Sequence, residues 1–542
     1  MQWHFLNDTI PNNPAALEEV LLANRNIIDS KAFFKPKSSE EISIEEVGID
    51  LEQLRLAKER LLEAIDNQQK ILVFGDYDAD GVCAAAVMWE ALHDLGADAL
   101  PFIPHREKHG YGLTWAAIEE LKKHPLPDLI ITVDTGITAV EPIKGLIKEG
   151  VEVIITDHHQ PDAILPDALA IVHTPAVSGA AVAWFLAREL NEAAAKRSLD
   201  LVAIAAISDL MPLRGINRSL VFHGLPKIKA TQRPGLKALM EVAGFDKKPL
   251  DAGTVGYGIA PRLNAMGRLS HGLDALRLLC TKSAKQAKQL ANLVDETNAD
   301  RQQLTEDLLQ LAKRQALGQK ERSLIIAHSP DFHEGVIGLI AGKLAEWYAK
   351  PTIVISTTGT TAKASARSVP GVNITELIRT GREHLLEVGG HPMAAGFGFE
   401  VSKLDEVMNY LYEHAQESID PELLQKKLDI ECLLPLKVVN QPLMAVIEKF
   451  APFGQQNPRP VFALQDVKIS DIQTVGAQQQ HLKLVLQDAD SGSEIPVLAW
   501  GKGEAANNLT VDSLVNVAGV LETNEWRNKQ TIQLILRDLQ PS

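Results

Sequence analysis

The chain has 542 residues, of which 45% are hydrophobic and 23% are charged, a mixture typical of globular proteins with substantial cores. This composition excludes a disordered acidic tail, a collagen-like chain and a small disulfide-stapled protein. At roughly 150 residues per domain, the length predicts about three or four domains. With 54 Lys and Arg against 70 Asp and Glu, the net charge is −16, so a nucleic acid would have to bind a local basic groove.

The cysteines and the uncharged segments both favour a cytoplasmic protein. Cys83, Cys280 and Cys432 are odd in number and far apart, so they form neither a disulfide framework nor a zinc motif. The first residues show no basic region followed by an apolar stretch. The longest uncharged run, 168–187, is interrupted by polar residues, proline and glycine, and we interpret it as a buried loop and helix. We therefore expect a soluble protein that does not bind a membrane.

The fold class is predicted to be α/β. Residues 1–69 read as an amino-terminal helical segment with one long amphipathic stretch. Over 70–272, short apolar runs alternate with helical stretches, which predicts a catalytic domain built on a parallel sheet with helices on both faces. In such sheets, ligands gather just beyond the carboxyl ends of the strands. The runs predicted to be strands are 71–74, 129–133 and 151–156.

The second half of the chain changes character twice. Ala, Leu, Gln and Lys at helical spacing predict a long connecting helix, or two, over 273–318. A second α/β domain is predicted over 319–426. The short alternating strands of 427–542 are typical of a small β-barrel such as an oligonucleotide-binding fold.

Three alternating carboxylates follow the first predicted strand. In ILVFGDYDADGV, Asp76, Asp78 and Asp80 crowd one loop, where they would repel one another strongly unless a divalent cation neutralised them. An EF-hand loop shares this pattern, but it requires a glutamate where this chain has Val87, and it follows a helix. Taken alone, such a turn is more often solvated or a helix cap than catalytic.

The next apolar runs also end in polar side chains. LIITVDTG ends in Asp134, VEVIITDHH ends in Asp157, His158 and His159, and a fourth run, LVAIAAISD, ends in Asp209. Singly, an Asx turn explains the first, and strand-end histidines are usually structural. Together they predict carboxylates and imidazoles at one edge of the sheet, a ligand set that favours Mn²⁺ or a similar ion. One carboxylate shared by two ions would give a two-metal centre for attack on phosphorus.

In this order, DYDADG, VDTG and Asp-His-His resemble the DHH phosphoesterase superfamily. The segments RPGLKALMEVAG, GYGIAPRLNAMGRL, HEGVIGLIAGKLAEWY, KASARSVPG, GGHPMAAGFGF and APFGQQNPRPVF then follow one another in family order. Nearly the whole chain, from about residue 70 onward, resembles the RecJ family of single-stranded-DNA-specific exonucleases. GGHPMAAG is typical of the DHH-associated domain, and PFGQQNP resembles the entry to the family's oligonucleotide-binding domain.

The resemblance implies a centre of two divalent ions bridged by Asp134, with Mn²⁺ as the expected metal and Mg²⁺ as the alternative. One ion would be held by Asp76, Asp78 and Asp134. The other would be held by Asp80, Asp134, His158 and Asp209. His159 would face the scissile phosphate, and Asp157 would orient a ligand histidine as an outer acceptor.

The resemblance also implies a pocket for a terminal 5′-phosphate, because guanidinium groups bind phosphate bidentately. Its residues would be Arg106, Arg262, Ser365, Arg367, Ser368, Gly390 and His391. Each arginine alone is more often part of an ion pair, and Arg268 is not assigned to the pocket. Tyr111, Trp115, Phe453 and Trp526 are candidates to stack bases, and Lys483, Arg527 and Lys529 are candidates to follow the backbone, although core or solvated positions are the usual alternative.

As a function, the resemblance implies 5′→3′ degradation of single-stranded DNA to mononucleotides in DNA repair and recombination. We expect a monomer, with a single-strand-binding protein and a RecQ-type helicase as candidate partners. The alternative enzyme is a DHH hydrolase of short oligoribonucleotides, cyclic dinucleotides or pyrophosphate, against which the carboxy-terminal barrel argues. A non-catalytic replication scaffold is a third hypothesis, but such relatives typically lose acidic motif residues that this chain retains.

Overall fold

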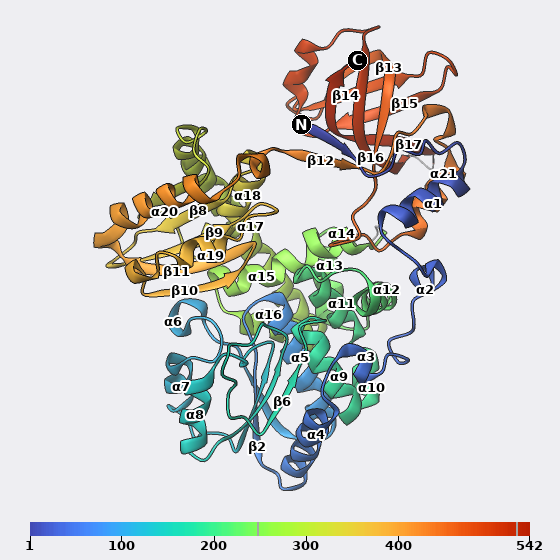
Figure 1. Ribbon diagram of the computed structural model, residues 1–542. Coiled ribbons are helices and arrows are strands. Elements are labelled where there is room, and N and C mark those ends of the chain that lie inside the picture. The colour runs from blue at the N-terminus through green and yellow to red at the C-terminus, as the bar shows by residue number, and fades with distance from the viewer. Residues whose placement is uncertain (247–248, 527–528) are drawn as a thin grey trace.

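The computed structural model describes residues 1–246, 249–526 and 529–542. Figure 1 shows two α/β lobes, one at the bottom and one at the left, and a β-barrel at the top beside which both termini lie. The predicted fold class is confirmed. In the described part of the chain, every helix is too short or too polar to cross a membrane.

The first lobe is built on a five-stranded parallel sheet with strand order β3-β2-β4-β5-β6. Successive residues of each strand point to opposite faces, so Val73 and Ile131 enter one core while Phe74 and Ile130 enter the other. Both faces are therefore buried, as a parallel sheet requires. The strands are β2 (Lys70–Phe74), β3 (Asp98–Phe102), β4 (Leu129–Val133), β5 (Glu152–Asp157) and β6 (Ala170–His173).

Helices cover both faces of this sheet. One face is covered by α7 (Trp115–Leu121) and α8 (Val140–Lys148), near the short α6 (Arg106–His109). The other carries α4 (Leu51–Asp66), α5 (Ala79–Asp94), α9 (Gly179–Leu190), α10 (Glu192–Arg197), α11 (Leu199–Ser208), α12 (Gly215–Lys229), α13 (Pro234–Val242), α14 (Ala252–Thr254), a π-helical turn (Val255–Ile259), α15 (Ala260–Leu269) and α16 (Gly272–Cys280).

Two apolar stretches of this lobe differ from what their sequences suggest. The run before Asp209 is the helix α11 and not a further strand; it is buried from Leu199 to Ala206, so it lacks the amphipathic period that identifies helices. Residues 168–187, predicted to be a loop and a helix, also contain the edge strand β6. Asp209 therefore reaches the sheet edge as the residue that caps a helix.

A single helix, α17 (Ala284–Leu317), connects the two lobes. Its Ala291 and Val294 pack in the core of the first lobe, and its Leu309 and Ala312 pack in a core of the second. The predicted connecting helix is thus shared by both cores, which fixes the lobes against each other.

The second lobe carries a mixed sheet of order β10-β11-β9-β8-β7, in which only β7 and β8 run parallel. Helix α18 (Ile337–Tyr348) packs on the face toward α17, and α19 (Ile374–Arg379) and α20 (Leu404–Ser418) pack on the other. The strands are β7 (Ile325–Ser329), β8 (Thr352–Ser356), β9 (Thr361–Arg367), β10 (Glu387–His391) and β11 (Ala394–Glu400).

The carboxy-terminal part is a closed barrel of order β13-β14-β15-β17-β16, in agreement with the predicted oligonucleotide-binding fold. Helix α21 (Gln441–Lys449) packs against its core. The strands are β13 (Val461–Val475), β14 (His481–Gln487), β15 (Glu494–Ala499), β16 (Leu514–Trp526) and β17 (Lys529–Pro541).

The first residues of the chain divide between two cores. Strand β1 (Gln2–Phe5) pairs in parallel with β12 (Lys427–Ile430), and α1 (Pro14–Asn24) packs in the barrel core. Helices α3 (Ile44–Val47) and α4 belong to the core of the first lobe, and α2 (Ser30–Phe34) lies between. Helical pieces were predicted here; the four-residue strand β1 was not, because its partner is more than 400 residues away.

Candidate metal centre and phosphate pocket

All six residues predicted to hold metal lie together at the carboxyl edge of the first sheet. Strands β2, β4 and β5 bring their following residues to this edge, and Asp209 arrives from the end of α11. Three groups of ligand atoms lie within 4.8 Å of one another: Asp76, Asp78 and Asp134; Asp80, His158 and Asp209; and Asp134, His158 and His159. Asp134 is common to two of these groups, which is the position expected of a bridging carboxylate.

Asp134 occupies the centre of the cluster in a strained conformation. Its backbone has φ 61°, a left-handed value that costs energy for a residue with a side chain. The carboxylate oxygen Oδ1 is buried without a hydrogen bond and lies 3.2 Å from His158 Nε2. At Gly179, an added Cβ would lie 2.1 Å from this oxygen, so only glycine leaves room for it.

Helix α9 holds a second carboxylate through its amino terminus. The backbone N–H groups of Gly179 and Ala180 donate to the two oxygens of Asp80 at 2.8 and 2.7 Å. A helix amino terminus carries partial positive charge and unpaired N–H groups, so it orients an anion well. His158 Nε2 lies 3.8 Å from both Asp80 and Asp209, with the imidazole nitrogen facing the carboxylates.

The charges of this cluster require a counter-ion. Burial, reinforced by the charge of Asp78, raises the pKa of Asp76 to about 8 and that of Asp209 to about 7. Burial and neighbouring aspartates also raise the pKa values of Asp80 and Asp134. Oδ1 of Asp76, like that of Asp134, is buried without a hydrogen-bond partner. Unpaired oxygens and mutually repelling carboxylates beside an imidazole fit divalent first-row ions.

His159 belongs to a different chain of contacts. Its Nδ1 lies 2.8 Å from Asp157 Oδ1, and its Nε2 lies 2.6 Å from the hydroxyl of Tyr111. Burial disfavours the imidazolium, but the hydrogen bond and charge of Asp157 outweigh it and raise the pKa of His159 to about 9. Of His158, Asp157 contacts the backbone N–H and not the ring, whereas it contacts both the backbone N–H and the ring of His159. Asp157 therefore orients His159 and not the candidate ligand His158.

Two arginines, Arg106 and Arg268, lie close enough to the carboxylate cluster to interact with Asp76 and Asp78, and Arg367 lies close to both arginines. In the described part of the chain, Arg106, Arg268 and Arg367 form no ion pair; Arg268 donates to the carbonyl of Gly335 at 3.1 Å and Arg367 to Ser365 Oγ at 3.2 Å. Burial, then the charges of Arg106 and Arg367, lowers the pKa of Arg268 to about 10. Guanidinium groups that repel one another and form no ion pair are suited to bind an anion such as a phosphate.

The other residues predicted for the phosphate pocket take different positions. His391 lies on β10, where it pairs with Ala394 of the neighbouring strand β11. Ala394 in turn pairs with Arg367 of β9, so His391 and Arg367 lie at the same level of the sheet, two strands apart. Gly390 has φ 146°, a value that favours glycine. Ser368 is committed to a turn, because its hydroxyl donates to the carbonyl of Val372 at 2.6 Å.

Arg262 is also committed elsewhere. Its Nε lies 2.8 Å from Asp295 Oδ1 of α17, and its Nη1 donates to the carbonyl of Gly258 at 2.7 Å. The structure therefore places Arg268, which was left unassigned, beside Arg106 and Arg367, and ties Arg262 to the connecting helix.

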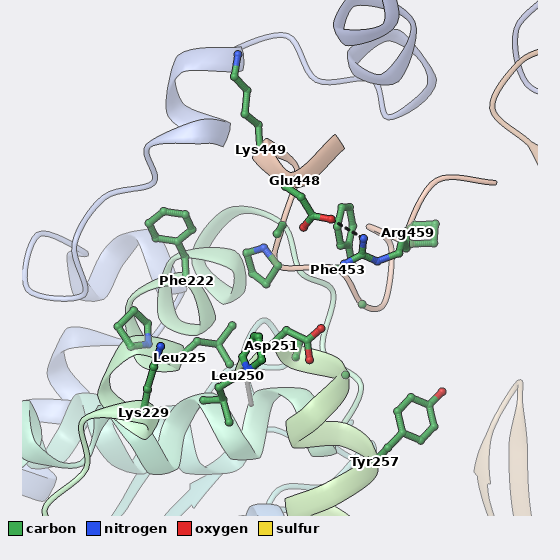
Figure 2. Close-up of a pocket in the computed structure, with 18 of the residues that line it drawn as sticks. Phe222, Leu225, Lys229, Leu250, Asp251, Tyr257, Glu448, Lys449, Phe453 and Arg459 are labelled. Carbon is green, nitrogen blue, oxygen red and sulfur yellow. Dashed lines mark hydrogen bonds and ion pairs between the residues drawn. The ribbon is translucent and has the colours of Figure 1, made fainter. Parts of the chain in front are cut away.

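Two adjoining cavities lie between the first lobe and the segment that enters the barrel. The smaller, of about 360 Å³, is lined by Ser208 and Leu210 on either side of Asp209. The larger, of about 960 Å³, lies between α12 and the segment that enters the barrel; Figure 2 shows its two walls. Tyr257 and Phe453 line both cavities. Tyr257 is 88% exposed and was missed, because its segment was used only as a family motif.

The other predicted stacking residues are scattered. Tyr111 contacts His159, and Trp115 covers Gly145 of α8, where an added Cβ would lie 2.4 Å from the indole. Lys483 lies exposed on β14, which agrees with the alternative interpretation of a solvated strand face. Arg527 and the side chains of Trp526 and Lys529 lie outside the described residues.

Comparison with known proteins agrees with this architecture. Three family models match: the DHH family N-terminal domain over 70–206, the DHHA1 domain over 321–417 and the RecJ OB domain over 430–538. The single-stranded-DNA-specific exonuclease RecJ of Thermus thermophilus is 34% identical over 503 residues, which cover 91% of this chain and 71% of that protein. The chain belongs to the RecJ family.

Solved RecJ structures share the fold and contain metal. The T. thermophilus RecJ structure in complex with Mn²⁺ matches with a TM-score of 0.85 at 30% identity, over 100% of this chain and 80% of that one. The same protein with Mg²⁺ matches with a TM-score of 0.78 at 28% identity, over 100% of this chain and 78% of that one. The RecJ of Bacillus subtilis is 34% identical over 504 residues, 90% of this chain, and the present chain spans 63% of its length.

Removing the charge of Asp134 should abolish metal binding at the cluster. In Asp134→Asn, the central oxygens lose their charge, so we expect Mn²⁺ affinity measured by calorimetry to fall at least about 100-fold. Asp66→Asn, on the exposed end of α4, is the matched control and should bind normally. Unchanged affinity in Asp134→Asn would show that the ions are held elsewhere.

The metal-free protein should lose stability as the pH rises from 6.5 to 8. Asp76, Asp209 and His159 have raised pKa values in the folded state, so the folded protein holds protons that the unfolded chain has released. Each such proton costs up to about 1.4 kcal/mol per pH unit. His158, with its pKa lowered to about 4, is neutral in both states over most of this range. Thermal unfolding in EDTA should show the decline, and Asp209→Asn should reduce it.

Proposed function

We propose that this protein is a metal-dependent exonuclease that degrades single-stranded DNA in the 5′→3′ direction to mononucleotides. The observation that carries the proposal is the carboxylate and histidine cluster, which has Arg106 and Arg268 close to it and a cavity lined by the residues on either side of Asp209. Its relatives in Thermus and Bacillus are named as single-stranded-DNA-specific exonucleases, which supports the substrate class.

The order of these features supports cleavage from the 5′ end. A terminal 5′-phosphate carries more charge than an internal one, so it would bind best to Arg106, Arg268 and Arg367. The next phosphate along the strand would then lie at the metal cluster, and the rest of the strand would continue past Asp209 into the groove. Hydrolysis at that phosphate would release one mononucleotide at a time.

The residues of the chain have separate roles in this reaction. Two divalent ions, Mn²⁺ by preference and Mg²⁺ as the alternative, would be held by Asp76, Asp78 and Asp134 and by Asp80, Asp134, His158 and Asp209. When bound, they supply an acidified water and neutralise charge on the phosphate. Asp157 fixes the ring of His159, whose Nε2 would exchange its contact with the Tyr111 hydroxyl for an oxygen of the scissile phosphate.

The groove supports a single strand as substrate. Tyr257 and Phe453 line both cavities, and an aromatic ring can stack on any base without reading sequence. We extend the proposal to DNA repair and recombination by a cytoplasmic monomer, in which a RecQ-type helicase and a single-strand-binding protein would supply the unpaired strand. A hydrolase of short oligoribonucleotides, cyclic dinucleotides or pyrophosphate would need neither the groove nor the barrel.

The direct test is a time course with Mn²⁺ on one oligonucleotide labelled at either end. A 5′ label should leave at once as a mononucleotide, while a 3′ label should remain on products that shorten stepwise. A blunt duplex of the same sequence should be spared. Loss of the 3′ label first, or cleavage of dinucleotides only, would contradict the proposal.

Arg367 should determine the preference for a 5′-phosphate. Loss of a charge-assisted hydrogen bond is worth about 1.5–3 kcal/mol, so Arg367→Ala should reduce the preference for 5′-phosphate over 5′-hydroxyl DNA by about 10- to 100-fold in kcat/KM. Arg262→Ala is the matched control, because its guanidinium is bound to Asp295, and it should keep the preference. Equal loss on both substrates in Arg367→Ala would place the pocket elsewhere.

A further inference from the structure

A fully buried arginine joins the catalytic lobe to the entry of the barrel. Arg218, on α12, is 1% exposed and forms no ion pair within the described residues. A buried guanidinium without an acidic partner must find other acceptors for its donors, because leaving them unpaired is costly. Its acceptors therefore show what the residue holds in place.

These acceptors are backbone carbonyls of two distant segments. Nη2 donates to Ala451 at 2.7 Å, and Nη1 donates to Phe450 at 3.1 Å and to Pro452 at 3.4 Å. On the other side, Nε donates to the carbonyl of Phe33 at 2.9 Å, and the guanidinium carbon lies 3.8 Å from the centre of that ring. One side chain thus binds the end of α21 and the amino-terminal segment to the first lobe.

A second set of bonds ties the same barrel-entry loop, residues 450–457, to the chain just after Asp209. The N–H of Leu213 donates to the carbonyl of Gln455 at 2.8 Å, and Arg214 Nε donates to that of Gln456 at 3.0 Å. At Gly454, an added Cβ would lie 2.7 Å from Leu213, so the two segments are in close contact. The barrel-entry loop is therefore bonded to the segment that carries a metal-binding aspartate.

The barrel-entry loop also forms one wall of the groove. In Figure 2, Phe453 and Arg459 lie on one side of the cavity and Phe222, Leu225 and Tyr257 on the other. Phe222 follows Arg218 by one turn of α12. The bonds of Arg218 to residues 450–452 thus hold the barrel-entry loop against α12, so they fix the separation of the two walls.

We infer that Arg218 is a specificity-determining residue, which holds the barrel in line with the catalytic lobe so that strands long enough to reach the barrel are cleaved in preference to short ones. The inference rests on the proposed function. Arg218 touches neither metal ligands nor the arginine pocket, so its loss should leave the chemistry at the cluster unchanged while weakening capture of the distant part of the strand.

The test compares two 5′-phosphorylated substrates, a trinucleotide and an oligonucleotide of about 20 nucleotides, more than one such barrel occupies. In Arg218→Met, kcat/KM for the long substrate should fall about tenfold through KM, with little change for the trinucleotide. A merely destabilised enzyme would lose activity equally on both, and that result would overturn the inference. Arg214→Ala removes one exposed bond of the same contact, and it should shift the ratio in the same direction if Arg218→Met does not fold.

Arg188→Met is the matched control. Arg188, on α9, also contacts aromatic rings and donates to carbonyls, those of Ser39 at 3.2 Å and Ile42 at 2.8 Å, but these lie beside the first lobe. Its substitution should leave the ratio of kcat/KM for the long substrate to kcat/KM for the trinucleotide as it is in the unaltered enzyme. An equal change of ratio in Arg188→Met would contradict a specific role for Arg218.

Small-angle X-ray scattering separates this inference from the proposed function. The radius of gyration of Arg218→Met should exceed that of the unaltered protein and of Arg188→Met, because the barrel is released. If the unaltered protein cleaves neither substrate, the proposed function is wrong. The scattering measurement still tests whether Arg218 holds the barrel-entry loop against the first lobe. An unchanged radius in Arg218→Met would overturn the inference by itself.

Discussion

The constraint on which the site depends is the repulsion between buried carboxylates at one edge of a parallel sheet. Asp76, Asp80 and Asp134 are each at most 2% exposed, so water cannot screen their charges. The fold holds them together by local means: the amino terminus of α9 binds Asp80, and a left-handed backbone with a facing glycine accommodates Asp134. Such an arrangement is stable as a set of anions only when cations complete it, which is why metal binding and stability are coupled here.

The group of arginines Arg106, Arg268 and Arg367 shows the corresponding repulsion between positive charges. Arg106 and Arg268 are close enough to the cluster to act on the pKa values of its groups, yet neither forms an ion pair with it. If these arginines contacted the aspartates directly, each set would neutralise the other, and neither metal nor phosphate would be needed. By keeping them apart, the fold leaves both charges available for ligands of opposite sign, even though the whole chain carries a net charge of −16.

The metal ligands could be predicted because they follow strands, and parallel strands bring their carboxyl ends to one edge regardless of tertiary detail. Which arginines lie together in the candidate phosphate pocket could be predicted only in part. Arg262 and Arg268 are six positions apart on α15, about 240° around the helix axis, so they face in different directions and only the packing of α15 decides which one faces the pocket. Asp157 likewise follows its strand as expected, but the choice between two adjacent histidines depends on ring orientations that the sequence does not encode locally.

The contacts that unite the parts of the chain were beyond local reasoning, because each joins residues far apart in sequence. Strand β1 finds its partner in β12, and Arg218 finds its acceptors at residues 450–452. The segment PFGQQNP was predicted only to mark the entry to the barrel, and its bonds to Leu213 and Arg214 show that it is also part of the first lobe's surface. This loop is bonded on one side to the chain that follows Asp209 and continues on the other side into the barrel. The cavities it lines are therefore formed by residues of both domains. The loop that enters the barrel is for this reason also a wall of the cavity beside Asp209.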